Sequence, residues 1–194
     1  MSTLQYYDEN AQDFFLSTID ADLSELYAHF LPRLKANSLI LDAGCGSGRD
    51  SKVFLDKGFN VVANDASPKL ANSANQYTGL EIQVCDFHNI QTTIPFDAIW
   101  ACASLLHVTA IDLPSTFQVL AAQLVSNGIF YCSFKYGTSS GMRNGRYFTD
   151  ANEAYLKEWL KHTPLKVDET WITSDVRSGR ETEKWLNAIL IKVA

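Results

Sequence analysis

Short apolar runs alternate with amphipathic stretches through the first two thirds of the chain. The apolar runs predict short strands over residues 38–41, 60–63, 79–84, 96–102 and 129–134. The amphipathic stretches between them predict helices over residues 51–57, 67–77 and 112–124. Ser67 and Pro68 supply a cap and a first-turn proline for the second of these helices. Alternating strands and helices at this spacing predict a parallel sheet covered on both faces.

The last quarter of the chain follows a different pattern. A helix is predicted over residues 150–161, with Asp150 and Glu153 placed as a capping box. Strands over 166–172 and 184–193 follow with no helix between them, and the polar linker 173–183 joins them. Such a connection predicts an antiparallel pair. The chain is therefore expected to form one α/β domain over residues 1–194, with a parallel sheet finished by an antiparallel hairpin.

A glycine cluster stands between the first strand and the first helix, in residues 41–49 (LDAGCGSGR). Glycines at such a turn let the backbone approach a ligand and aim helix N-terminal amides at it. Arg49 occupies the third-glycine position of a dinucleotide fingerprint, which disfavours a nicotinamide cofactor. Asp65 ends the second strand 21 residues after Gly44, where a carboxylate can accept hydrogen bonds from ribose hydroxyls. The alternative is a tight turn beside a surface aspartate.

Residues 40–48 resemble the first motif of the class I S-adenosylmethionine-dependent methyltransferases, and residues 96–107 resemble the family's fourth-strand motif. The resemblance covers residues 5–193. It implies a Rossmann-like, doubly wound, mainly parallel sheet of seven strands in the order 3-2-1-4-5-7-6, with an antiparallel last strand. Residues 45–51 and 185–187 are similar to small bacterial, tellurite-resistance-like methyltransferases.

The same resemblance implies S-adenosylmethionine as cofactor, S-adenosylhomocysteine as product, and no metal. Asp86 and Phe87 match the place that holds the adenine, and Asp42 lies near the methionine amino group. Residues 1–30 resemble a helical lid from which Tyr7 contacts the cofactor, although a solvated helix face is the alternative. The full set of predicted cofactor-binding residues is Tyr7, Asp42, Gly44, Cys45, Gly46, Gly48, Arg49, Asp65, Ala66, Asp86, Phe87 and Ala103.

His107 is the candidate general base. Methyl transfer is an in-line displacement that depends on proximity and orientation, and a base helps only where the nucleophile must lose a proton. His107 follows the fourth strand, at the carboxyl-end rim where such sheets bind ligands. A packed or capping histidine is the alternative. The fourth strand is not followed by the Asp/Asn-Pro-Pro-aromatic run that clamps a base amine, which argues against a DNA substrate.

Basic residues gather in two C-terminal segments of an otherwise acidic chain. Residues 135–147, in the predicted acceptor-side loop 135–150, contain three basic residues and no acid. Arg177 and Arg180 lie in the linker before the last strand. We predict a small anionic acceptor, bearing carboxylate or phosphate, that is bound by some of Lys135, Arg146, Arg177 and Arg180. Alternatively, these side chains pair with Asp150, Asp175, Glu181 and Glu183.

Composition and charge restrict the kinds of binding partner and the cellular location that we expect for this chain. The 194 residues include 16 basic and 22 acidic side chains, a net charge of −6. Residues 1–134 carry 6 basic and 14 acidic side chains, which disfavours polyanion binding by the body of the protein. The longest uncharged apolar stretch, residues 98–106, is too short to span a bilayer, and no signal peptide is visible. The four cysteines fit neither a zinc site nor a disulfide framework, so a cytoplasmic location is expected.

These observations favour a methyltransferase that acts on a small molecule, as a monomer or homodimer. Three alternatives stay open: a methyltransferase acting on protein or RNA, a non-catalytic module that binds S-adenosylmethionine, and a nicotinamide oxidoreductase. Tellurite as acceptor is suggested by the family resemblance alone.

Overall fold

The computed structural model describes residues 2–177 and 179–193. Its main sheet has seven strands: β1 (Leu39–Ala43), β2 (Asn60–Asp65), β3 (Gln83–Val84), β4 (Phe96–Ala101), β5 (Leu124–Lys135), β8 (Leu165–Ser174) and β9 (Lys184–Lys192). Their order is β3-β2-β1-β4-β5-β9-β8. β9 runs opposite to the other six strands, which are parallel to one another. Counted within this sheet, the order is the predicted 3-2-1-4-5-7-6, so the predicted fold class is confirmed.

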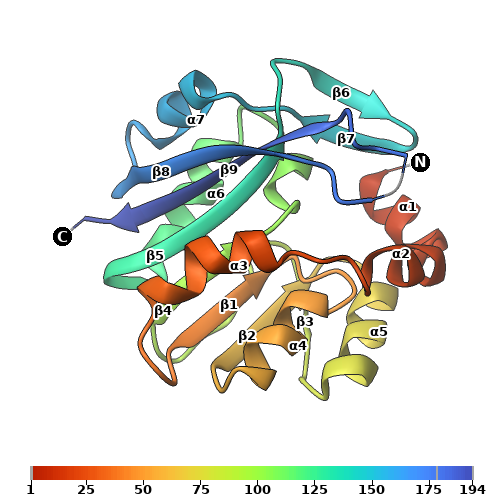
Figure 1. Ribbon diagram of the computed structural model, residues 1–194, viewed down its shortest axis with the longest axis horizontal. Helices are drawn as coiled ribbons and strands as arrows, with labels where there is room; N and C mark the ends of the chain where they lie inside the picture. Colours follow the sequence, from red (N-terminus) through yellow and green to blue (C-terminus); the bar gives the residue numbers. More distant parts are fainter. Residues whose placement is uncertain (1, 178, 194) are drawn as a thin grey trace.

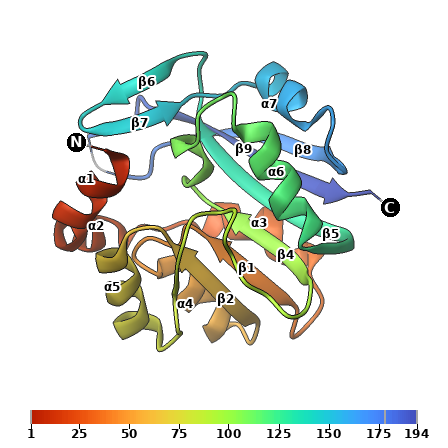
Figure 2. The ribbon, with the colours of Figure 1, turned by 180° about the vertical axis from the view of Figure 1, so that it is seen from behind.

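Helices cover both faces of the sheet. They are α1 (Thr3–Glu9), α2 (Ala11–Thr18), α3 (Ser24–Phe30), α4 (Arg49–Asp56), α5 (Pro68–Thr78), α6 (Leu113–Ala122) and α7 (Glu153–Leu160), with short 3-10 helices η1 (Leu31–Arg33) and η2 (Leu105–His107). Figure 1 shows α3 and α4 in front of the sheet, and Figure 2 shows α6 on the opposite face. No helix of the described residues is long and apolar enough to cross a membrane.

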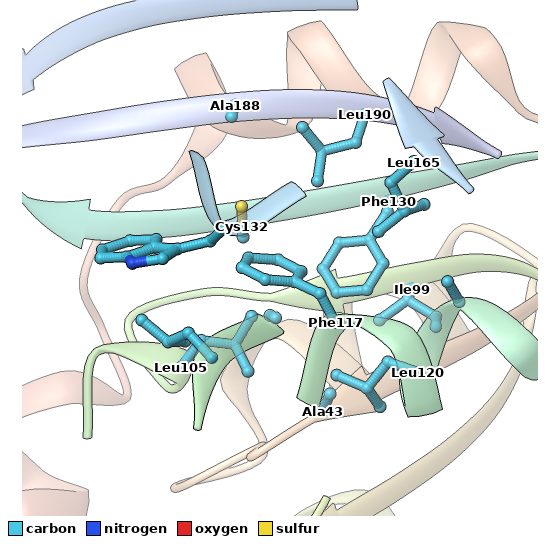
Figure 3. Close-up of a cluster of buried hydrophobic side chains, with 14 of the residues drawn as sticks. Ala43, Ile99, Leu105, Phe117, Leu120, Phe130, Cys132, Leu165, Ala188 and Leu190 are labelled. Atoms are coloured by element: carbon cyan, nitrogen blue, oxygen red, sulfur yellow. The ribbon is translucent and has the colours of Figure 1, made fainter. Parts of the chain in front are cut away.

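Two apolar layers hold these helices to the sheet. On one face, Phe117 and Leu120 of α6 pack against Ile99 and Phe130, as Figure 3 shows. On the other face, α3 and α4 pack on a buried aromatic cluster in which the rings of Trp100 and Tyr131 are stacked 3.9 Å apart. Because neighbouring strand residues point to opposite faces, the continuous apolar runs of β4 and β5 supply both layers.

Most predicted elements lie where local signals placed them. Ser67 caps α5, and its side chain accepts a hydrogen bond from the backbone of Leu70 at 3.2 Å. The predicted third strand is shorter than expected, at Gln83–Val84. Strand β5 begins earlier than the predicted residue 129, at Leu124, and within this extension Asn127 takes a positive φ of 61° and the register with β4 shifts.

The predicted capping box at Asp150 is wrong. Helix α7 begins at Glu153, and Asn152 caps it by accepting a hydrogen bond from the backbone of Tyr155 at 2.9 Å. Asp150 is instead buried, where it pairs with Arg143 at 2.5 Å. A buried carboxylate without a cationic partner costs more free energy than an uncapped helix end, where water can take the place of the cap.

The acceptor-side loop contains a hairpin that the sequence analysis missed. Strands β6 (Ser140–Arg143) and β7 (Arg146–Thr149) pair antiparallel around Asn144 and Gly145, whose φ angles are 49° and 78°. Both values suit a two-residue hairpin turn. The hairpin lies beside α1 (Figure 1), and the backbone N–H of Tyr147 donates to the hydroxyl of Thr3 at 2.8 Å.

Candidate functional site

A cavity of about 800 Å³ lies between the glycine loop after β1, the N-terminal helices and the β6–β7 hairpin. Its wall includes the segment after β4 and the linker before β9, so it occupies the carboxyl-end rim of the parallel strands. Eleven of the predicted site residues line it: Tyr7, Gly44, Cys45, Gly46, Arg49, Ala103, His107, Lys135, Arg146, Arg177 and Arg180. The cavity thus joins the glycine loop to the predicted acceptor side.

The glycine loop is tied to the end of β2. The backbone N–H groups of Gly44 and Cys45 both donate to the carbonyl of Asn64, at 3.0 and 2.8 Å. The N–H of Gly46 donates to Asp65 Oδ2 at 2.9 Å, and the N–H of Ser67 donates to Asp65 Oδ1 at 2.8 Å. Burial raises the pKa of Asp65, and these two donors oppose the rise. They hold the carboxylate beside the loop while leaving it lone pairs for a ligand.

Gly44 is required by both space and backbone conformation. Its φ is 76°, and a Cβ built there would lie 2.6 Å from the Cβ of Ser104. Ser104 is itself fixed, because its hydroxyl donates to the carbonyl of Ala43 at 2.6 Å. Ala103, just before it, has a positive φ of 51°, and its backbone N–H donates to the hydroxyl of Ser133. The rim of the cavity is therefore closely packed where the ends of β1 and β4 meet.

Asp42 does not line the cavity. The carboxylate is 2% exposed beneath the glycine loop, where it accepts a hydrogen bond from the hydroxyl of Ser51 at 2.6 Å. Burial and the charge of Asp50 raise the pKa of Asp42. The structure therefore does not bring this predicted residue to the cavity wall, because the strand register turns its side chain into the interior.

Asp50 is the centre of a buried network that the sequence analysis missed. Its carboxylate accepts hydrogen bonds from the hydroxyl of Tyr27 at 2.6 Å and the indole N–H of Trp100 at 2.7 Å. Arg49 donates to both oxygens, from Nε at 2.6 Å and Nη2 at 3.0 Å. Burial alone would raise the pKa of Asp50, but Arg49 and the other donors bring it below its ordinary value. The sequence did offer one signal of this network, because Asp50 directly follows Arg49.

Several of the predicted cofactor-binding residues do not line the cavity. Ala66 and Asp86 are exposed, and Phe87 is half-buried. Asp86 accepts hydrogen bonds from its neighbours, the backbone N–H of His88 at 3.0 Å and the Asn89 amide at 2.7 Å. Phe87 reaches back towards the glycine loop, since its ring lies 3.5 Å from a Cβ built at Gly44. Gly48 and Asp65 complete the set outside the wall.

His107 forms a hydrogen-bonded pair with Tyr7 across the cavity. Its Nδ1 lies 2.6 Å from the carbonyl oxygen of Tyr147, and because a carbonyl only accepts, Nδ1 carries the hydrogen. In the neutral ring Nε2 is then an acceptor, and the Tyr7 hydroxyl donates to it at 2.7 Å. Burial lowers the pKa of His107 to about 4. The imidazole is therefore neutral at pH 7, and both of its nitrogens are engaged.

Three of the four predicted acceptor-side cations lie beside two acids, Asp175 and Glu183. Lys135 pairs with Glu183. Arg177 donates to both oxygens of Asp175, at 2.9 and 2.6 Å, and this pairing holds the pKa of Asp175 down to about 2 against the effect of burial. Arg180 lies 3.9 Å from Glu183. The alternative of internal pairing thus describes these three side chains.

Arg146 differs from the other three cations. It forms no ion pair with any residue of 2–177 or 179–193, and its buried Nε has no hydrogen-bond partner there. Its guanidinium carbon lies 4.6, 5.8 and 5.1 Å from the ring centres of Tyr6, Tyr7 and Phe148. The aromatic rings stabilise the charge, and the guanidinium also lies within hydrogen-bonding reach of the Tyr7 phenol, which opposes the rise that burial causes in the Tyr7 pKa.

The described residues contain neither a cluster of metal ligands nor a disulfide. No three His, Cys, Asp or Glu side chains come together there as a metal site. The four cysteines are unpaired, and Cys45 and Cys102 line the cavity. Burial raises the pKa of both of these thiols, so they are protonated at neutral pH.

Comparison with known sequences identifies the central segment. Residues 40–128 match a family model described as a methyltransferase domain. The alpha N-terminal protein methyltransferase 1 of Drosophila melanogaster is 29% identical over 161 residues, and an uncharacterized methyltransferase of Staphylococcus carnosus is 26% identical over 129 residues. These alignments include 74% and 66% of this chain. They span 58% of the length of either relative.

Solved structures extend the likeness to the whole fold. A putative Haloferax volcanii methyltransferase, crystallised with the Trm112 activator, has a TM-score of 0.80 at 18% identity over 98% of both chains. The magnesium protoporphyrin IX methyltransferase of Synechocystis, with S-adenosylhomocysteine bound, has a TM-score of 0.76 at 17% identity, covering 97% of this chain and 96% of that one. The 1,6-didemethyltoxoflavin-N1-methyltransferase of Burkholderia thailandensis has a TM-score of 0.74 at 20% identity, covering 98% and 87%.

Proposed function

We propose that this chain, of which residues 40–128 match the model of a methyltransferase domain, binds S-adenosylmethionine and transfers the methyl group to a small anionic acceptor. The observation that carries the proposal is the single cavity wall that joins the glycine loop to Arg146 and His107. A cofactor on the loop and an acceptor beside Arg146 would share one enclosed space. The neighbours crystallised with S-adenosylmethionine or S-adenosylhomocysteine support the choice of cofactor.

The residues present suit this cofactor. S-adenosylmethionine carries a ribose diol and a zwitterionic methionine end but no phosphate, so it needs carboxylates and backbone groups rather than a basic cradle. Asp65, held by the N–H groups of Gly46 and Ser67, would receive the ribose hydroxyls. The close-packed Gly44 loop lets the ligand approach the backbone. Asp86 and Phe87 would flank the adenine, outside the enclosed part of the cavity.

The proposed chemistry depends on positioning. The bound cofactor supplies a methyl group on a positively charged sulfur, which is already activated for displacement. The chain's task is to hold a nucleophile in line and exclude water, and such ordering accounts for much of the rate enhancement in reactions of this type. Tyr7, Phe14 and Phe148 provide an apolar wall on the acceptor side. Neutral His107 offers a proton acceptor at pH 7, through its hydrogen bond with Tyr7.

A protein acceptor is the second candidate, because the Drosophila relative is named as an alpha N-terminal protein methyltransferase. A protein α-amine becomes cationic when protonated, and Arg146, which forms no ion pair with residues 2–177 or 179–193, would then repel it in the same cavity. This mismatch favours the small anionic acceptor. The tellurite-resistance-like subfamily, the oligomeric state and the cytoplasmic location stay predictions.

Calorimetric titration tests the cofactor assignment. Wild-type protein, freed of copurified ligand, is titrated with S-adenosylmethionine, S-adenosylhomocysteine and NADH. We expect saturable binding of the two adenosyl ligands and none of NADH. Asp65→Ala should weaken binding by at least about tenfold, because a carboxylate with two ribose hydrogen bonds is lost. The control Glu81→Ala removes an exposed acid away from the cavity and should bind as wild type does. Folded protein that binds neither adenosyl ligand would refute the proposal.

A further inference from the structure

The unpartnered cation and the Tyr7–His107 pair lie on the same side of the cavity. The rings of Tyr7 and His107 are 5.3 Å apart, and Arg146 lies 5.8 Å from the Tyr7 ring. Phe148 contacts both, with its ring 4.9 Å from that of His107 and 5.1 Å from the guanidinium carbon of Arg146. One small ligand can therefore contact the cation and the phenol at once.

The hydrogen-bond directions decide what Tyr7 offers to a ligand. Nδ1 of His107 donates to the carbonyl of Tyr147, so Nε2 accepts the Tyr7 proton. The phenol oxygen has then used its only donor, and the lone pair that does not face the Arg146 guanidinium is left for a ligand. Tyr7 consequently presents a hydrogen-bond acceptor to the cavity, which suits a ligand O–H or N–H.

Arg146 offers the complementary function. Its donors are not taken up by an acid of the described chain, whereas Lys135, Arg177 and Arg180 are all paired. The β6–β7 hairpin and α1 hold it from both sides, through Phe148 and Tyr6. A fixed guanidinium in the cavity wall, with no acid among residues 2–177 and 179–193 to neutralise it, is suited to a planar carboxylate.

We propose that the acceptor is a small molecule bearing a carboxylate together with a hydroxyl or amine nucleophile, with Arg146 binding the carboxylate and the Tyr7 oxygen accepting a hydrogen bond from the nucleophile. This inference rests on the proposed function and names the substrate class of the same site. It assigns Tyr7 to the acceptor, whereas the sequence resemblance assigned it to the cofactor. His107 becomes a positioning residue, because it acts on the acceptor only through the direction of the Tyr7 hydroxyl.

The test uses benzoate, 3-hydroxybenzoate and phenol as probes, titrated by calorimetry into protein saturated with S-adenosylhomocysteine. We expect both carboxylates to bind, 3-hydroxybenzoate about threefold or more tighter than benzoate, and phenol weakest. Arg146→Gln should weaken both carboxylates by about tenfold or more. Tyr7→Phe should leave benzoate unchanged and abolish the preference for 3-hydroxybenzoate.

The control and the His107 variant separate these effects from loss of structure. Lys166→Gln removes an exposed cation that does not line the cavity, and it should bind all probes as wild type does. His107→Gln can still accept the Tyr7 hydrogen bond, and it should retain the preference that His107→Phe loses. Failure of wild type to bind either carboxylate, or unchanged carboxylate binding in Arg146→Gln, would overturn the inference. Binding of S-adenosylhomocysteine is measured first, so loss of the proposed function itself would be seen separately.

Discussion

At the scale of single residues, alanine substitutions at Gly44 and Gly79 distinguish the effect of backbone strain from that of a steric clash. Their φ angles are 76° and 77°, so alanine is strained at either position. A Cβ at Gly44 would lie 2.6 Å from Ser104, whereas a Cβ at Gly79 has nothing within 4 Å. We expect each alanine variant to lose about 1 kcal/mol of unfolding free energy from strain. Gly44→Ala should also weaken S-adenosylhomocysteine binding by at least about tenfold.

Urea unfolding and calorimetry measure the two effects. Gly79→Ala is the matched control, and it should bind the ligand as wild type does. Equal ligand affinity in both variants would mean that the contact between Gly44 and Ser104 does not shape the cofactor site. A double variant, Gly44→Ala with Ser104→Gly, removes the opposing side chain and should recover part of the lost affinity.

The same scale shows what could be read from the sequence. The closeness of the glycine loop to Asp65 was predictable, because it depends on spacing along one strand-turn-helix-strand unit. The isolation of Arg146 was not, because all four candidate cations have acids nearby in sequence, and only the folded chain decides which pairs form. Asp42 illustrates the same limit, since its strand position carries it under the loop.

At the scale of elements, α1 bridges the two halves of the site. Asp8 accepts hydrogen bonds from the hydroxyl of Ser67 at 2.5 Å and the backbone N–H of Lys69 at 3.3 Å, at the start of α5. Thr3 holds the same helix to Tyr147 of β7. Helix α1 has no buried residue of its own, so these polar contacts and Tyr7 determine its position. Its hold on the protein should therefore be weak and local.

Asp8→Ala is expected to release the cofactor end of α1. Amide hydrogen exchange over residues 3–9 should become faster, and S-adenosylhomocysteine affinity should fall by about threefold to tenfold, because the cavity loses part of its cover. Global unfolding free energy should change by no more than about 1 kcal/mol, since the contact is at the surface. Glu9→Ala, on the same helix and without these contacts, is the control. Unchanged exchange in Asp8→Ala would contradict the role of this contact.

The elements also differ in how well the sequence predicted them. The antiparallel β9 could be predicted, because a polar linker with no helix joins the last two strands, whereas the strand order was implied by the family resemblance of residues 40–48 and 96–107. The β6–β7 hairpin was missed although Asn144 and Gly145 are a hairpin turn pair, because each flanking strand has only four residues and neither shows a clear alternation of apolar and polar positions. Asp150 looked like a cap, but the hairpin places it in a buried ion pair instead.

At the scale of the whole molecule, two buried groups set opposite limits on the stable pH range. Burial raises the pKa of Asp42 above its unfolded value, so the neutral form that favours folding is lost as the pH rises through the folded value. Burial lowers the pKa of His107 to about 4, below its unfolded value of about 6.5. On the acid side the unfolded chain therefore binds the His107 proton first, and stability falls with pH.

His107 links η2 to α1 and β7 through its two hydrogen bonds. Its protonation should therefore weaken the contacts among these three elements in the cavity wall. Between about pH 6.5 and pH 4, the unfolding free energy should fall by up to roughly 3 kcal/mol through this one group, the equivalent of its pKa difference. Urea unfolding at a series of pH values measures the slope, and His107→Gln, which has no charge to gain, should show a shallower one. Equal slopes in the two proteins would mean that His107 has the same pKa in the folded and unfolded states. The assignment of a neutral imidazole with hydrogen bonds at both nitrogens would then be wrong.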